Sequence, residues 1–173
     1  MDTAIGCVDI REEPQGARRK AVFYAVFAAG LAVFLGLSFT GIFGVRSDTV
    51  RATGGGYELA VRYGATSRPA LATPFDVEVR RPGGFDGPVT VAVTADYLAM
   101  WDENGLSPSP SGESQDGEWE VWEFDPPDGD LLVISFDARI EPAAQSGRAG
   151  TVEVRDDAGA AVVAVDFETK VLP

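Results

Sequence analysis

The stretch Ala21–Val45, AVFYAVFAAGLAVFLGLSFTGIFGV, decides the organisation of this chain, because it holds twenty-five consecutive residues without a charged side chain. At about 1.5 Å of rise per residue, a helix of this length exceeds the roughly 30 Å hydrocarbon core of a bilayer. A single segment inside lipid can satisfy its backbone amides only as a helix. The sequence therefore predicts one transmembrane helix over residues 21–45, after a tail of residues 1–20.

The basic residues beside this segment predict its orientation. Arg18, Arg19 and Lys20 stand directly before it, and basic flanks stay in the cytoplasm. We therefore expect a plasma-membrane protein with a cytoplasmic N-terminal tail and an extracytoplasmic C-terminal domain. The alternative is a cleaved signal peptide, whose apolar region would span about 7–15 residues and end in a small-x-small site. The longer run observed here favours an uncleaved signal-anchor.

Small residues recur at every fourth position of the predicted helix, at Ala28, Ala32, Gly36, Thr40 and Gly44. Small side chains let a second helix approach closely, and such packing drives helix association in lipid. The stripe predicts a helix-packing face for another transmembrane helix, from either a multi-pass partner or a second copy of this chain. A plain anchor without a helix partner is the alternative.

The charge of the chain is concentrated after the apolar segment. Residues 46–173 carry 23 acidic and 10 basic side chains, which account for the net charge of −13. Binding nucleic acid or anionic headgroups requires cations, so the composition predicts neither as a partner and favours cations or a basic protein face. The two Lys against twelve Arg are typical of high-GC bacteria.

Beyond residues 46–56, which the consecutive glycines Gly54–Gly56 mark as a tether, the hydrophobic period changes from helical to two. Residues 95–117, rich in Pro, Gly and Ser, are expected to form a long loop. The remaining pattern predicts a mostly β domain, residues 57–173, folded as an immunoglobulin-like antiparallel β-sandwich of about seven strands. The predicted strands are residues 57–63, 75–80, 89–94, 119–124, 131–140, 151–155 and 161–172.

Catalytic chemistry is not predicted, and no enzyme activity is expected. The chain has no His, and its one Cys, Cys7, lies in the tail on the other side of the predicted membrane. No cofactor is expected, with Ca²⁺ as the one candidate. Asp125, Asp128 and Asp130 place hard oxygen ligands close together beside Gly129, as Ca²⁺ loops do. The alternative is that Asp and Gly are simply the residues that turns prefer.

Large aromatic residues fall on both faces of the predicted strand 119–124. Trp119 and Val121 alternate with Trp122 and Phe124, and Trp101 precedes this strand in the expected loop. One face must therefore leave aromatic rings that need cover, from either a neighbouring loop or a bound partner. We take Trp101, Trp122 and Phe124 as candidate partner-binding residues.

These observations predict a non-catalytic, single-pass membrane protein that acts as an accessory or interaction subunit. Its span would pack against a membrane partner, and its acidic domain would dock on the extracytoplasmic face of that partner. The alternative is a membrane-anchored module that binds a cation or the cell envelope.

Overall fold

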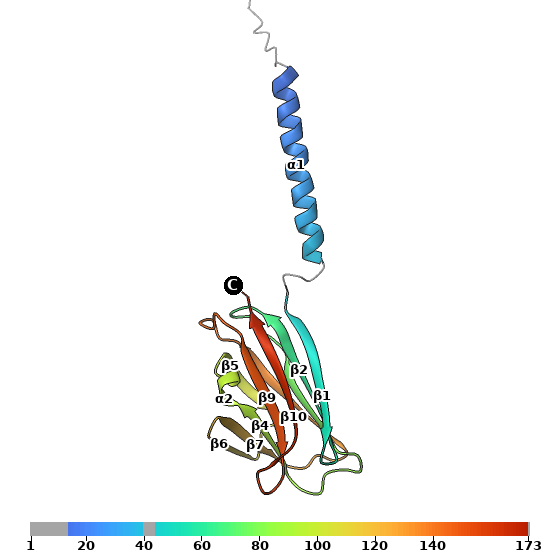
Figure 1. Cartoon of the computed structure of the whole chain (residues 1–173), viewed down its shortest axis with the longest axis vertical. Coiled ribbons are helices and arrows are strands. Elements are labelled where there is room, and N and C mark those ends of the chain that lie inside the picture. The colour runs from blue at the N-terminus through green and yellow to red at the C-terminus, as the bar shows by residue number, and fades with distance from the viewer. Residues whose placement is uncertain (1–13, 40–43, 173) are drawn as a thin grey trace, which may run out of the picture. The chain divides into compact units, whose positions relative to one another are not determined.

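The computed structural model describes residues 14–39 and 44–172, which belong to two separate units, a helix and a β domain (Figure 1). Helix α1 spans Pro14–Phe39, and its segment Arg18–Phe39 has a mean hydropathy of 2.2. Within the described residues this is the one helix long and apolar enough to cross a membrane, although a signal sequence would meet the same criteria. The helix begins before the predicted Ala21 because proline is well tolerated in a first helical turn.

The β domain is mostly strand, as the sequence predicts, with one short helix. Each of the seven predicted strands is present, but the expected number was wrong because the described residues form ten. In chain order the elements are β1 (Arg46–Gly54), β2 (Tyr57–Ser67), β3 (Phe75–Arg80), β4 (Val89–Thr94), α2 (Ala95–Leu98), β5 (Trp101–Ser107), β6 (Gly112–Asp116), β7 (Trp119–Phe124), β8 (Leu131–Ile140), β9 (Arg148–Arg155) and β10 (Ala161–Val171).

Strand β1 corrects the prediction of a tether over residues 46–56. It pairs with β2 along its whole length, from Arg46 opposite Thr66 to Gly54 opposite Tyr57. Gly55 and Gly56 connect the two strands and both have positive φ, 57° and 83°. A two-residue hairpin turn of type I′ needs positive φ at both positions, which glycine adopts without strain. The glycines that suggested a tether therefore build a hairpin.

Residues 95–117 also differ from the expected long loop. They contain α2 and the edge strands β5 and β6, which pair with β8 and β7 respectively. Residues Gly112–Asp116 of β6 are polar and mostly exposed, so they lack the alternation of apolar and polar residues by which a half-buried strand is recognised.

The ten strands form one curled sheet, in the order β5-β8-β3-β2-β10-β9-β4-β7-β6, with β1 paired to β2. The sheet curls into a half-barrel (Figure 1). Its two halves join where β2 and β10 run parallel over two register pairs, Lys170 with Thr66 and Val171 with Ser67. The two halves form one sheet with more strands than the seven expected, because β2 extends past the end of β3 and so reaches β10.

The two ends of the β domain carry different parts of the chain (Figure 1). Strand β1 begins at one end, where β2 and β10 terminate, and we call this end the base. The β1–β2 turn lies at the opposite end, which we call the tip. The loops between β3 and β4, β7 and β8, and β9 and β10 share the tip.

Aromatic rings fill the centre of the β-domain core. Phe75 of β3 contacts Phe136 of β8 at 4.5 Å between ring centroids, Tyr97 of α2 at 5.3 Å, and both Trp101 of β5 and Phe167 of β10 at 5.8 Å. Every buried hydrophobic residue of the described chain lies between Leu59 and Val171. The β domain thus has a complete core of its own and is expected to fold without the helix.

Tyr97 fixes α2 to the strands beneath it. Its side chain is fully buried, its hydroxyl hydrogen-bonds the Thr169 hydroxyl of β10 at 2.9 Å, and its ring packs edge-on against Phe167. Gly150 of β9 makes room for this ring, because a Cβ there would lie 2.7 Å from Tyr97 Cγ. Burial raises the pKa of Tyr97 far above its usual 10.0.

We expect the stability of the β domain to fall above pH 10 because of Tyr97. A pKa raised by folding means that the native state keeps a proton which the unfolded state loses, so stability is complete below about pH 10 and declines above it. One such group removes up to about 1.4 kcal/mol per pH unit. Urea unfolding of residues 44–173 between pH 8 and pH 11 measures this slope.

The Tyr97→Phe variant should lose about 1 kcal/mol at neutral pH, with the hydrogen bond to Thr169, and show a flatter alkaline slope. Thr169→Val is the matched control, because it removes the same hydrogen bond but leaves the tyrosine to ionise. Equal alkaline slopes in the two variants would contradict the assignment.

Candidate interaction surface

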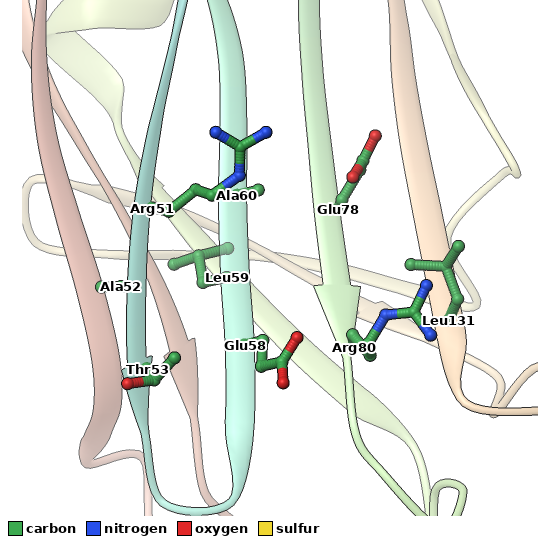
Figure 2. A pocket seen from close by; sticks show the side chains of 9 residues that line it. All are labelled: Arg51, Ala52, Thr53, Glu58, Leu59, Ala60, Glu78, Arg80 and Leu131. Carbon is green, nitrogen blue, oxygen red and sulfur yellow. The ribbon is translucent and has the colours of Figure 1, made fainter.

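The outer face of β1, β2 and β3 contains a hollow centred on a small residue. Ala60 of β2 lies between Arg51 of β1 and Glu78 of β3 in the register of the sheet. Because its methyl group is much shorter than these neighbours, it leaves a hollow of about 250 Å³. Figure 2 shows Arg51 beside Ala60, with Glu58 extending from β2 toward β3.

Two more hollows adjoin this one at the tip. The second shares Thr53 and Glu58 with the first and reaches Tyr57 and Pro82. The third lies between loop residues 83–85 and 127–130, and its Asp130 pairs with Arg80 of the first hollow. We call these three neighbouring hollows together the hairpin-end surface, and its defining residues are Thr53, Tyr57, Glu58, Ala60, Arg80, Phe85 and Asp130.

Aromatic contacts hold the loops of the hairpin-end surface together. The rings of Tyr57 and Phe85 lie 6.4 Å apart, and the Arg81 guanidinium is 5.3 Å from the centroid of Tyr57. Arg81 also pairs with Asp86 at 2.6 Å. Tyr57 and Phe85 are half-buried, so part of each ring remains accessible beside the hollows.

The charges around the first hollow are incompletely paired. Arg80 pairs with Asp130 at 2.9 Å, and both side chains are nearly half exposed, so this ion pair adds little stability. In the part of the chain that the structure describes, Arg51, Glu58 and Glu78 make no ion pair. These three side chains are therefore available to charges on another molecule.

The predicted Ca²⁺ ligands do not form a cluster. Asp130 is held by Arg80, and Arg81 N–H donates a hydrogen bond to the Asp130 backbone carbonyl. Among the described residues no three acidic, His or Cys side chains come together in a group that could hold a metal ion. Asp125, Asp128 and Asp130 share one turn at the tip, and the structure shows no common point toward which they converge.

The predicted aromatic patch was wrong, because its residues belong to the core. Phe124 is fully buried, and Trp122 is buried against Phe136 with ring centroids 5.4 Å apart. Trp101 is half-buried and stacks on Phe75, and its indole Nε1 is buried without a hydrogen-bond partner in the described residues. Aromatic residues lie on both faces of β7, and Trp122 and Phe124 lie on the face that points into the core.

Part of Trp122 still reaches a second concave region, beside α2. It lines an acidic groove of about 500 Å³ with Leu98, Glu113 and Glu120, on the inner side of β6 and β7. Gln115 donates a hydrogen bond to Glu120 across these strands at 3.0 Å. No basic side chain lines this groove, so it adds to the acidic character of the domain.

The helix carries only part of the predicted small-residue stripe. Ala28, Ala32 and Gly36 lie on α1 with exposed surfaces, and Thr40 lies outside the described residues. Gly44 is not helical, so its place on a helix-packing face was wrong. The orientation residues Arg18, Arg19 and Lys20 lie in the N-terminal part of the same helix and are exposed.

We expect Ca²⁺ to leave the stability of the β domain unchanged. A ligand that binds only the native state must raise the thermal midpoint, but Asp130 is already paired with Arg80. Calorimetry of residues 44–173 with and without millimolar Ca²⁺ measures the shift, with Mg²⁺ as the control for ionic strength. A midpoint that rises with Ca²⁺ and not with Mg²⁺, and is lost in Asp128→Asn, would establish a site.

Comparison with known proteins assigns no family to this chain. No protein-family model matches the sequence, and no curated protein matches it. The functional interpretation of the hairpin-end surface therefore depends on its own geometry and charge.

Proposed function

We propose that this protein is a non-catalytic, single-pass membrane protein whose extracytoplasmic β domain docks on a protein partner through the hairpin-end surface. Helix α1 would serve as an uncleaved signal-anchor, with Arg18, Arg19 and Lys20 holding its N-terminus in the cytoplasm. The single observation that carries this proposal is that three hollows lie together at one end of the domain, linked by shared residues and by the Arg80–Asp130 ion pair, with half-buried aromatic rings beside them.

The chemistry of the hairpin-end surface indicates the kind of partner. Interface anchors are enriched in Tyr and other aromatics, which combine large contact area with few rotatable bonds. Tyr57 and Phe85 supply such rings, and the tip loops around them hold several carboxylates, including Asp86, Asp125 and Asp128. The partner would present basic side chains around an apolar contact, and this charge complementarity would accelerate encounter.

A non-catalytic role fits the placement of the titratable groups. The chain has no His, and Tyr97, whose pKa is shifted most clearly, is sealed in the core against Thr169 and Phe167. A catalytic group must reach the reacting atoms of a substrate, which a fully buried side chain does not.

We also propose an immunoglobulin-like origin for the β domain. The seven strands that the sequence predicts divide into β2-β3-β8 in one half of the sheet and β10-β9-β4-β7 in the other. Three and four antiparallel strands facing each other across a core are typical of immunoglobulin-like sandwiches. In this interpretation β1, β5 and β6 are additions at the edges.

The docking proposal is tested by filling the first hollow. Ala60 points outward, so Ala60→Trp should leave the fold intact while blocking a partner from the hollow. The full-length tagged protein, extracted in mild detergent from its own host, should co-purify with a stoichiometric partner, and Ala60→Trp should reduce that yield at least tenfold. Native mass spectrometry measures the stoichiometry.

Ala164→Trp is the matched control, because Ala164 is an exposed alanine on the outer face of β10, away from the hollow. It should retain the partner. A full-length protein that purifies without a companion, or equal losses in both variants, would contradict the proposed docking surface.

The helix-packing proposal is tested separately at Gly36. A Gly36→Leu substitution places a bulky side chain on the small-residue face, where close approach of a second helix depends on the missing side chain. We expect it to weaken co-purification of a membrane partner, or dimerisation, without changing the β domain. Gly30→Leu is the control, because Gly30 lies on another face of α1 and both glycines have open space around them. Equal effects of the two variants would show that the stripe has no role.

A further inference from the structure

The base of the β domain gathers basic side chains that have no acidic partner. Arg46 of β1 lies opposite Thr66 of β2, and Lys170 of β10 lies opposite the same threonine. Arg68 follows β2 directly at this end. Within the described residues none of these three side chains makes an ion pair, so three positive charges meet at one end of an acidic domain.

The other basic residues of the β domain behave differently. Apart from Arg51 at the first hollow, each of them is paired with at least one carboxylate. The pairs are Arg62 with Asp76, Arg80 with Asp130, Arg81 with Asp86, Arg139 with Asp102, Arg148 with Asp96, and Arg155 with Asp116 and Glu153. Unpaired cations are therefore concentrated at the base.

Exposed apolar side chains gather at the same end. Leu71 and Leu172 are each 40% exposed, and they are two of the three large hydrophobic residues that the described β domain leaves exposed. Leu172 N–H donates a hydrogen bond to the Ser67 carbonyl, which fixes the end of the chain beside the end of β2. The base thus combines cations with exposed leucines.

A strained turn presents two of these residues. Leu71 N–H donates to the Arg68 carbonyl across Pro69 and Ala70, and Ala70 N–H donates to the Ile140 carbonyl of β8. Ala70 has a φ of 64°, a conformation that favours glycine and is rarely adopted by other residues. A residue keeps such an unfavourable backbone conformation only where the surrounding structure holds it in place, and such residues often lie at functional surfaces.

Acidic side chains show the opposite distribution and are more numerous at the tip than at the base. At the base, Asp96 and Asp102 pair with Arg148 and Arg139, whereas Glu141 and Glu118 of the β6–β7 turn make no ion pair among the described residues. Asp48 and Glu168 lie two residues farther from this end, along β1 and β10. The tip loops hold six aspartates: Asp86, Asp125, Asp128, Asp130, Asp156 and Asp157.

The position of the base along the chain indicates what it faces. Arg46, the first residue of β1, directly follows Val45, the last residue of the apolar run that begins at Ala21. The described helix ends at Phe39, and Arg46 follows seven residues later, which is at most about 25 Å of extended chain. If α1 spans the bilayer, this connection keeps Arg46 near the extracytoplasmic headgroups. Lys170 and Arg68 share this end of the domain with Arg46, so they lie within reach of the same headgroups.

We propose that the base binds the anionic headgroups of the surrounding bilayer, through Arg46, Arg68 and Lys170, with Leu71 and Leu172 entering the interface. The proposal rests on the membrane anchoring proposed above. It differs, for this one end of the domain, from the sequence-based expectation that anionic lipids are poor partners for the acidic chain. Repulsion of the acidic tip by the same anionic surface would reinforce a fixed orientation, with the hairpin-end surface directed away from the membrane.

The test uses the full-length protein in nanodiscs, with Cys7→Ser and a single fluorophore at Ala72→Cys, an exposed position next to Leu71. Quenching by a spin-labelled lipid headgroup reports contact with the membrane. We expect strong quenching in phosphatidylcholine mixed with phosphatidylglycerol, weaker quenching in phosphatidylcholine alone, and a loss of quenching as salt screens the charges. A label at Asp157→Cys, on the tip, should stay unquenched.

Charge removal identifies the residues responsible. Each of Arg46→Gln, Arg68→Gln and Lys170→Gln should lower the ratio of docked to undocked domain about fivefold in anionic nanodiscs, because a basic residue at an anionic surface contributes about that factor. Arg51→Gln is the matched control, since it removes an equally unpaired arginine at the first hollow, away from the base. In nanodiscs, which hold no protein partner, it should leave the ratio of docked to undocked domain unchanged.

The outcomes separate this inference from the proposed function. Equal quenching in both lipids, unaffected by the three Gln variants, would show that only the short connection keeps the base near the membrane, and would overturn the inference. The absence of quenching in a protein that resists carbonate extraction would also overturn it, while leaving the anchor intact. A protein that carbonate releases from membranes would instead refute the anchoring itself.

Discussion

The rings packed around Phe75 join parts of the chain that are distant in sequence, and the rest of the β domain depends on that packing. They connect β3 to β8, β10, β5 and α2, and so hold the two halves of the curled sheet face to face. Among the described strands, the ladder that joins the two halves is the one between β2 and β10, over two register pairs. The one Cys of the chain is Cys7, which precedes the β domain, so no disulfide can replace these contacts.

Much of the fold could be predicted from the period of the hydrophobic residues, and the failures have definite causes. Strands β3, β4, β7 and β8 match their predicted bounds, because alternating valines and aromatics describe a half-buried strand directly. Strand β1 was missed because Gly55-Gly56 was interpreted as a break in structure, although two glycines between strands also fit a type I′ turn. Strand β6 was missed because a polar edge strand has no apolar face to reveal it.

The candidate surface was much less predictable than the fold. The hollow at Ala60 exists because that alanine lies between Arg51 and Glu78, and the pairing of β1 with β2 and of β2 with β3 determines this arrangement. Since the sequence did not predict β1, it did not predict the hollow. Trp122 was taken as a candidate binding residue because aromatic residues on both faces of β7 left the inward face open, and the packing of the folded domain buries Trp122 and Phe124.

The β1–β2 hairpin also determines how the domain would respond to mechanical load. The chain enters β1 at the base, and the turn at Gly55-Gly56 lies at the far end, so tension applied at Arg46 runs along the strand. Antiparallel hydrogen bonds lie perpendicular to their strands, and tension along β1 therefore shears the ladder from Arg46 to Gly54 as a unit instead of opening it one bond at a time. If the domain were pulled between a membrane anchor and a bound partner, this ladder would resist the separation of β1 from β2. The first strand would then protect the rest of the β domain from unfolding under load.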